Sequence, residues 1–233
     1  MGLRIFETDP NAKPRQREND TVGRFRTGRQ INNRPESLAT FRVTTGDPEV
    51  ADAVSKLFGG SPAEWETSGE DFTEVITDRD KVLIVIDGAS SLKFDMRLYG
   101  RTGLIHHCDG VDSLLNEDKG QPCGCPTLLE DRKAFAKSGR GPQPYTFING
   151  FRIADDYGLG KFRLQTTSWT ILPYLDQYWA DLGNIDGEAL AELSLELVEY
   201  TTKTGRDVSY RRPALKIIKP WSEAMTDNAD TDY

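Results

Sequence analysis

The sequence contains few cysteines and histidines, and it lacks any long hydrophobic run. Three cysteines and two histidines occur among 233 residues. Three is an odd number, and Cys123 and Cys125 are too close together to bridge comfortably, so we expect no disulfide framework and a reducing cytoplasm. The longest apolar run, residues 82–86, is too short to span a bilayer. The amino terminus has no apolar segment typical of a secretion signal, which also favours the cytoplasm.

The sequence also lacks the short motifs that identify several enzyme classes. The deaminase pattern, His-x-Glu followed by Pro-Cys-x-x-Cys, is absent, and so is His-Glu-x-x-His. Gly59-Gly60 is not followed by the Gly-Lys-Ser/Thr element of a nucleotide-binding loop. Both histidines lie in one short segment, which leaves none for an active site elsewhere. With no motif for an active site, we predict that the protein is not an enzyme.

Positive charge is scarce overall but concentrated near the amino terminus. The chain has 29 Lys and Arg against 37 Asp and Glu, and this net charge of −8 disfavours a strong hold on the nucleic-acid backbone. Residues 13–34 are the exception, because they contain seven basic residues and only two acidic ones. We interpret them as part of a solvated arm. The alternative is an arm that contacts nucleic acid or an acidic partner.

Three segments of the chain differ in composition. Residues 1–36 are mostly polar and lack an apolar period, so we predict a flexible basic N-terminal arm. Residues 37–220 are predicted to form a single α+β domain with a zinc-binding insertion at about residues 100–142. Residues 221–233 are predicted to be an acidic disordered tail, because residues 223–233 contain four acids and no base.

The predicted domain mixes helix and strand signals. Asp47-Pro48 predicts the start of a helix that Gly59-Gly60 ends, and a second helix is predicted from residue 171. Strands are predicted at residues 41–43, 72–77, 82–86, 92–98, 145–148 and 162–164, with a hairpin between 193–197 and 208–218. A strand, a helix and a strand pair follow one another twice. This order suggests two repeated strand–helix–hairpin units in a mixed or antiparallel sheet.

All the cysteines and histidines occur within one short segment. It contains His106, His107 and Cys108, followed by Cys123 and Cys125. Thiolate and imidazole are ligands that zinc prefers, and a structural site needs four of them. Alternate residues of an extended segment share a face, so we expect His106 and Cys108 to join Cys123 and Cys125, with His107 as the alternative fourth ligand. The sequence therefore predicts a structural Zn²⁺ that folds the insertion.

The order of several short motifs resembles a known protein family. The motifs are residues 38–45 (Leu-Ala-Thr-Phe-Arg-Val-Thr-Thr), 57–60 (Leu-Phe-Gly-Gly) with Trp65, 108–110 (Cys-Asp-Gly) with the Cys123/Cys125 pair, and 160–164 (Gly-Lys-Phe-Arg-Leu) ahead of 167–169 (Thr-Ser-Trp). Together they resemble the actinobacterial and actinophage Gp3-like proteins over residues 38–218. The family's namesake is the recombination directionality factor of a Streptomyces temperate phage that carries a large serine integrase.

The resemblance implies a regulator that acts through a protein partner. Such a factor binds its phage's serine integrase and switches it from integration to excision, the attL × attR reaction, without itself cutting DNA. It implies work in the cytoplasm of the bacterial host, with little or no direct DNA binding. The metal insertion and the basic arm are the candidate surfaces for contact with the integrase.

The resemblance leaves the ligand set and the function open to alternatives. Many members have a further cysteine after the Cys-x-Cys pair, where this chain has Gly141-Pro142-Gln143-Pro144. The fourth ligand is then a histidine, or the metal is weakly held or absent. The alternative function is a zinc-containing single-stranded-DNA-binding or replication-associated phage protein, in which the basic arm and exposed aromatic residues hold nucleic acid.

Overall fold

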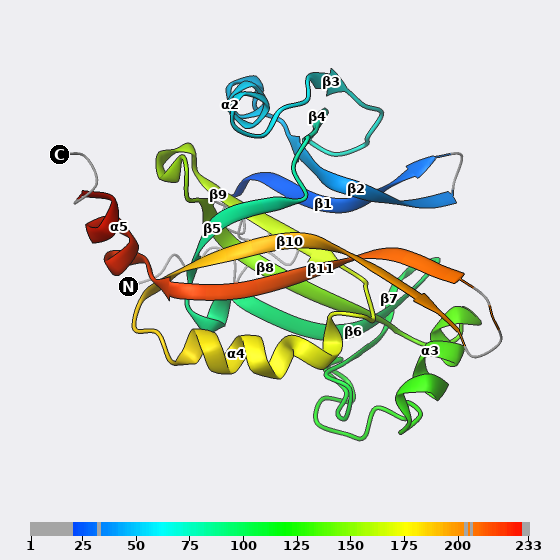
Figure 1. Cartoon of the computed structure of the whole chain (residues 1–233). Coiled ribbons are helices and arrows are strands. Elements are labelled where there is room, and N and C mark those ends of the chain that lie inside the picture. The colour runs from blue at the N-terminus through cyan, green and yellow to red at the C-terminus, as the bar shows by residue number, and fades with distance from the viewer. Residues whose placement is uncertain (1–20, 32–33, 203–204, 206, 230–233) are drawn as a thin grey trace, which may run out of the picture.

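Strands dominate the computed structural model, which describes all residues except 1–20, 32–33, 203–204, 206 and 230–233 (Figure 1). The strands are β1 (Thr21–Ile31), β2 (Arg34–Thr45), β3 (Pro62–Glu64), β4 (Thr73–Ile76), β5 (Lys81–Asp87), β6 (Leu92–Gly100), β7 (Gly103–Cys108), β8 (Gln143–Ile153), β9 (Lys161–Thr166), β10 (Glu188–Thr201) and β11 (Asp207–Pro220). The α-helices are α2 (Pro48–Phe58), α3 (Leu129–Lys137), α4 (Leu175–Gly183) and α5 (Trp221–Ala229). The predicted α+β class is confirmed.

The described strands form one mixed sheet. Its main path runs β11-β10-β5-β8-β9-β1-β2-β4-β3, and β6 and β7 branch from β8. The pairing of β1 with β9 is parallel, whereas the other ladders are antiparallel. Strand β2 also contacts β10 and β11, which lie near the opposite end of this order. The sheet therefore curls around a common interior.

Alternate residues of the strands fill this interior. Phe25 of β1, Phe41 of β2, Phe151 of β8 and Phe162 of β9 are almost fully buried. The ring centroid of Phe25 lies 5.5 Å from that of Phe41, 5.4 Å from Phe151 and 5.5 Å from Phe162, each in an edge-to-face arrangement that aromatic rings prefer. A Cβ atom at Gly23 would lie 2.8 Å from the Phe162 ring, so this packing requires glycine.

Helix α2 begins and ends where the sequence predicts. The Asp47 Oδ1 atom accepts the backbone N–H of Glu49 at 2.9 Å, and Pro48 lies in the first turn, where its missing N–H costs nothing. Gly59 ends the helix with a φ of 77°, a conformation that favours glycine. The buried residues of the helix are Val50, Ala51, Val54 and Phe58. This face packs on β2 and β4 and covers one end of the sheet.

Strand β8 is shared by two branches of the sheet. Its residues 143–148 pair with β6, whereas Arg152 and Ile153 pair with β5. Strand β9 pairs with its other edge, with an irregularity between Asn149 and Phe151. The β5 branch continues into β10 and β11, and the β6 branch ends in the β6–β7 hairpin. This second branch positions the cysteines and histidines.

Two segments predicted to be irregular form regular structure instead. Residues 21–31 and 34–36, assigned above to the flexible arm, form β1 and the start of β2, and Phe25 is only 1% exposed. Residues 221–229, assigned to the disordered tail, form α5, which contacts β10 and β11. The prediction of irregular structure is wrong for these residues. They have few buried apolar side chains, so no apolar period marks them in the sequence, and their order comes from contacts with distant strands. Residues 1–20 and 230–233 lie outside the described part.

The remaining predicted elements are confirmed with shifted bounds. The second helix begins with a short 3-10 turn at Leu172–Tyr174 and continues as α4, and β10 pairs with β11 as the predicted hairpin. The two repeated units, and the division into arm, domain and tail, stay predictions. Among the described residues, no helix combines the length and apolar character needed to cross a membrane.

Candidate metal centre

The β6–β7 hairpin brings His106 and Cys108 to one face of the second branch. In this ladder Cys108 lies opposite Met96 and His106 lies opposite Leu98. Alternate residues of a strand point to the same side, so His106 and Cys108 face together and His107 faces away. The shared face predicted for His106 and Cys108 is confirmed.

The loop after Cys108 turns back on itself and returns Cys123 to the same place. The Asp109 Oδ1 atom accepts the backbone N–H groups of Val111 and Asp112, each at 2.8 Å, which fixes the turn. The Cys123 N–H donates to the Val111 carbonyl oxygen at 2.8 Å. The outgoing and returning parts of the loop are thus joined by a hydrogen bond close to the end of β7.

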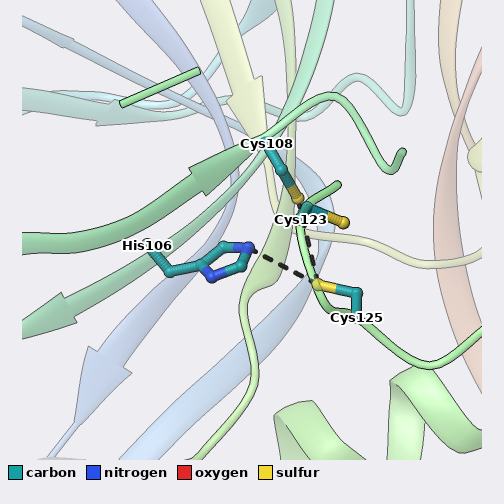
Figure 2. A group of neighbouring side chains, drawn as sticks. All are labelled: His106, Cys108, Cys123 and Cys125. Atoms are coloured by element: carbon teal, nitrogen blue, oxygen red, sulfur yellow. Dashed lines mark hydrogen bonds between the residues drawn. The ribbon is translucent and has the colours of Figure 1, made fainter. Parts of the chain in front are cut away.

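Gly124 lets the chain turn between the last two cysteines. Its φ is 71°, in the left-handed region that costs other residues conformational energy. No atom lies within 4 Å of the place where a Cβ atom of residue 124 would be, so the backbone conformation, not space, favours glycine there. Figure 2 shows Cys125 directed toward His106 and Cys108 as a result.

The four side chains are close enough to share one ion. One ligand atom from each of His106, Cys108, Cys123 and Cys125 lies within 4.8 Å of every other. The Cys125 sulfur lies 3.4 Å from His106 Nε2 and 4.0 Å from the Cys108 sulfur. Metal bonds of about 2.3 Å to sulfur and about 2.0 Å to nitrogen, at tetrahedral angles, would put ligand atoms roughly 3.5–3.8 Å apart. The cluster fits a tetrahedral ion with soft ligands.

Burial keeps two thiols of this cluster, Cys108 and Cys125, protonated in the metal-free protein. It raises the pKa of Cys108 to about 12, although the backbone N–H of Gly110, which donates to the sulfur, opposes the shift. Burial, followed by the neighbouring Cys123, also raises the pKa of Cys125. A cation bound among these sulfurs reverses the balance, because it stabilises the thiolate over the thiol.

The two histidines are in different surroundings. Burial and the neighbouring His107 lower the pKa of His106, so its imidazole is neutral near pH 7 and has a lone pair for a metal. His107 instead places Nε2 at 3.2 Å from Asp95 Oδ2. The Asp95 carboxylate accepts its hydrogen bonds from Arg97, at 2.6 and 2.5 Å. The structure therefore brings His106 into the cluster and leaves His107 outside it.

A groove of about 550 Å³ adjoins the cluster, and we call it the metal-side groove. Residues 109–111, which follow Cys108, and Thr127 and Leu129, which follow the Cys123/Cys125 pair, contribute to one wall. Trp169 and the helix α4 contribute to the other. Both segments that carry the cluster thus continue directly into the lining of the groove, so an ion held by the cluster would also fix the shape of this surface.

Arg132 of α3 links the helix to the segment after Cys125. Its Nε atom donates to the Pro126 carbonyl oxygen at 2.5 Å, and its Nη1 atom lies 3.9 Å from the Met96 sulfur. Neither Arg132 nor the groove is evident from the sequence, and Asp109 stands out there only as a member of the Cys-Asp-Gly motif. Asp109-x-x-Asp112 carries a local turn signal, but no local pattern relates Arg132 to β6, which precedes it by more than thirty residues.

Comparison with protein-family models gives a match over most of the chain. A protein-family model described as "Gp3-like: Recombination directionality factor-like" matches residues 22–218, which is most of the chain and includes the whole cluster. No solved structure matches the chain. The matched range begins within β1 and ends within β11, so it also includes the curled sheet.

Proposed function

The chain belongs to the Gp3-like, recombination directionality factor-like family, and from this membership we propose that it is a recombination directionality factor for a phage serine integrase. In this proposal the protein binds the integrase on attachment-site DNA and switches it from integration to excision. The integrase cuts and rejoins the DNA, and the factor carries out no bond-breaking step. The match over residues 22–218 is the observation on which the proposal depends.

Such a switch needs differential binding and no further chemistry. A factor changes the direction of recombination when it binds the excision-competent arrangement of integrase more tightly than the competing arrangement. Equal affinity for both would shift nothing, however tight the binding. An acidic protein of net charge −8 suits this role, because it can approach a basic DNA-binding enzyme while holding free DNA weakly.

The metal in this proposal is a structural Zn²⁺. His106, Cys108, Cys123 and Cys125 would hold it, and three sulfurs with one imidazole nitrogen are a set that favours zinc over magnesium or calcium. The four ligands leave no open coordination position for a substrate. The ion would then stabilise the turns at residues 109–111 and 126–129, which form part of the metal-side groove.

We assign the integrase contact to the metal-side groove. Val111 and Leu128 beside it are 71% and 68% exposed, which is unusual for large apolar side chains and typical of contact surfaces. Asp109 and Asp176 lie in its lining, while the positive Arg132 is bonded to Pro126. The groove therefore suits an amphipathic helix that has an apolar face and flanking lysines or arginines.

A recombination assay tests the proposed function. Purified integrase is incubated with attL and attR DNA, with and without this protein, and the attP and attB products are quantified. We expect excision only when the protein is added, together with reduced attP × attB integration. Equal recombination with and without the protein, using an integrase from the same phage, would reject the function.

A pair of matched variants tests the assigned surface. Leu128→Glu introduces a charge beside the groove, whereas Met225→Glu makes the same change in α5, where Met225 is 54% exposed. We expect Leu128→Glu to reduce integrase binding by about tenfold or more, as for a central contact residue, and Met225→Glu to leave it unchanged. Equal effects of the two variants on integrase binding would show that the contact lies elsewhere on the protein, and the proposed function would still stand.

A further inference from the structure

Arginines gather on the outer face of three neighbouring strands, β9, β1 and β2. Their inward residues, such as Phe25, fill the core, so the alternate positions point outward. In the sheet register Arg24 of β1 lies beside Arg163 of β9, and Arg26 of β1 lies opposite Arg42 of β2. We call these four residues the arginine face. Like charges directly opposite one another destabilise a sheet, so the arrangement has a cost.

Acidic neighbours neutralise only half of this face. Arg24 pairs with Asp71 at 2.8 Å, and Arg42 pairs with Glu74 at 2.5 Å. Among the described residues, Arg26 and Arg163 have no carboxylate within 4.0 Å, and Arg26 donates instead to the Thr44 hydroxyl at 3.0 Å. The guanidinium groups of Arg26 and Arg163 therefore lie beside two other arginines and have no carboxylate partner of their own among the described residues.

Burial makes the shortage of counter-charge more costly. It lowers the pKa of Arg26, and Arg42 and Arg24 lower it further. Burial, followed by the charge of Arg24, lowers the pKa of Arg163 in the same way. The charge of Asp71, which pairs with Arg24, opposes both shifts in pKa. Desolvation and the neighbouring arginines outweigh it in each case, and a bound anion would relieve both effects.

Two adjoining cavities lie over this face. The smaller, of about 90 Å³, is lined by Arg24, Arg26 and Arg163 together with Phe25 and Gln165. The larger, of about 700 Å³, shares Arg26 and continues past Arg42 to Arg211. Hydroxyl groups line its length: Thr27, Ser37, Thr166, Thr167 and Ser168. Donors that bind oxyanions therefore follow a track and do not surround a single point, although the Glu36 carboxylate, paired with Arg29 at 2.6 Å, also lines it.

We propose that the arginine face and this track form a binding site for the phosphate backbone of nucleic acid. The small cavity would hold one phosphate among three guanidinium groups, whose planar N–H groups match phosphate oxygens in pairs. The hydroxyls and Arg211 would contact the phosphates that follow along the strand. This site goes beyond the proposed function, because a factor that acts only through integrase needs no phosphate contacts.

The extended shape and the donor types favour nucleic acid over a single small anion. A repeating polyanion can fill a track that has arginines at Arg26, Arg29 and Arg211, whereas one phosphate can occupy only part of it. Arg29 pairs with Glu36 and Arg211 with Asp80, so Arg26 is the arginine of the larger cavity without a carboxylate partner among the described residues. Trp65 adds an aromatic surface, with the Arg42 guanidinium 4.3 Å from its ring centroid. The acidic charge of the rest of the molecule would keep the affinity for free nucleic acid low at physiological salt.

Fluorescence anisotropy with a labelled single-stranded oligonucleotide and its duplex tests the proposal at a series of salt concentrations. We expect wild type to bind at low salt and Arg26→Gln/Arg163→Gln to bind about tenfold or more weakly. Each lost phosphate contact should also reduce the slope of log K against log salt by about 0.7 for the single strand and about 0.9 for the duplex. Arg101→Gln, an exposed arginine of the β6–β7 turn, removes equal charge per substitution and should bind as wild type does.

Thermal unfolding of the same variants separates a binding role from a structural one. Removing mutually repelling arginines should leave the melting temperature unchanged or raise it, whereas removing structural residues would lower it. The single Arg163→Gln variant serves if the double variant fails to fold. The proposal is wrong if wild type binds neither oligonucleotide at low salt, or if the double variant binds them as tightly as wild type does. Labelled polyglutamate serves as a polyanion without phosphate, and binding of polyglutamate but of neither oligonucleotide would also overturn the proposal. Stronger binding of single strand or duplex identifies the form recognised.

Discussion

The interior around Phe25 and the insertion around Cys108 are stabilised by different interactions. Phe25 contacts four other aromatic rings, with centroids 5.4 to 6.4 Å away, inside the curl of the sheet. Between residues 103 and 142, by contrast, the buried apolar side chains are Cys108, Ala136 and Pro142. Hydrophobic burial accounts for the first region, whereas the second has little of it and depends on turns, hydrogen bonds and, in the proposal above, an ion.

The largest expected effect is on the interior. Phe25→Ala removes a ring from the centre of the aromatic cluster, and we expect a loss of about 3–5 kcal/mol in the free energy of unfolding. Urea unfolding followed by circular dichroism measures it. Phe72→Ala is the control, because Phe72 is 46% exposed and its loss should change stability little. Similar losses in the free energy of unfolding for both variants would show that the buried ring of Phe25 contributes no more to stability than an exposed one.

Removal of the metal should affect the insertion and spare the interior. We expect a strong chelator to increase amide hydrogen exchange at residues 108–125 by at least about tenfold, because their order depends on the ion. Amides of β1 and β2 near Phe25 and Phe41 should keep their protection, since hydrophobic contacts hold them. Elemental analysis of the untreated protein gives the metal and its stoichiometry. Uniform loss of protection over the whole chain would contradict the difference between the two regions.

The two histidines offer a matched pair of variants within the insertion. His106→Ala removes a ligand of the cluster, and we expect metal affinity to fall by at least about a hundredfold, since loss of mere supporting groups already costs about 10–100-fold. His107→Ala, on the opposite face beside Asp95, should change it far less. Competition with a chromogenic chelator measures both. The reverse order of effects would make His107 the fourth ligand.

Metal binding should strengthen as the pH rises. Burial raises the pKa of Cys108 to about 12 and also raises that of Cys125, so both are neutral thiols near pH 7 in the metal-free fold. Each must lose a proton when the metal binds, and each such proton makes the affinity rise about tenfold per pH unit. Chelator competition over a pH series measures this slope. A flat profile would show that the thiols are already ionised or do not bind the metal.

Local signals in the sequence were sufficient for much of this structure. Asp47-Pro48 and Gly59 define α2 because caps and helix ends depend on adjacent residues. The shared face of His106 and Cys108 follows from the period of a strand. The fourth ligand stayed open between two histidines because the return path of residues 109–125 depends on turns whose geometry the sequence does not fix.

Long-range contacts explain what the sequence did not reveal. Strand β1 has one core aromatic residue among arginines, and its parallel partner β9 lies more than a hundred residues away, so no local alternation marks it. The arginine face depends on the same distant pairing, which places Arg163 beside Arg24. Residues 13–34 were thus recognised as unusually basic, but their outward face on a sheet was not predicted.

Strand β8 divides its length between two neighbours, with β6 along residues 143–148 and β5 at Arg152 and Ile153. The β6–β7 hairpin, which carries Cys108 and both histidines, is therefore attached separately from the β5 branch, because its pairing with β8 ends before that of β5 begins. We expect changes in the length or composition of this hairpin and the loop after it to leave the pairing of β5 with β8 intact. The surface around the hairpin can therefore change while the sheet of β5, β8, β10 and β11 keeps its strand pairing.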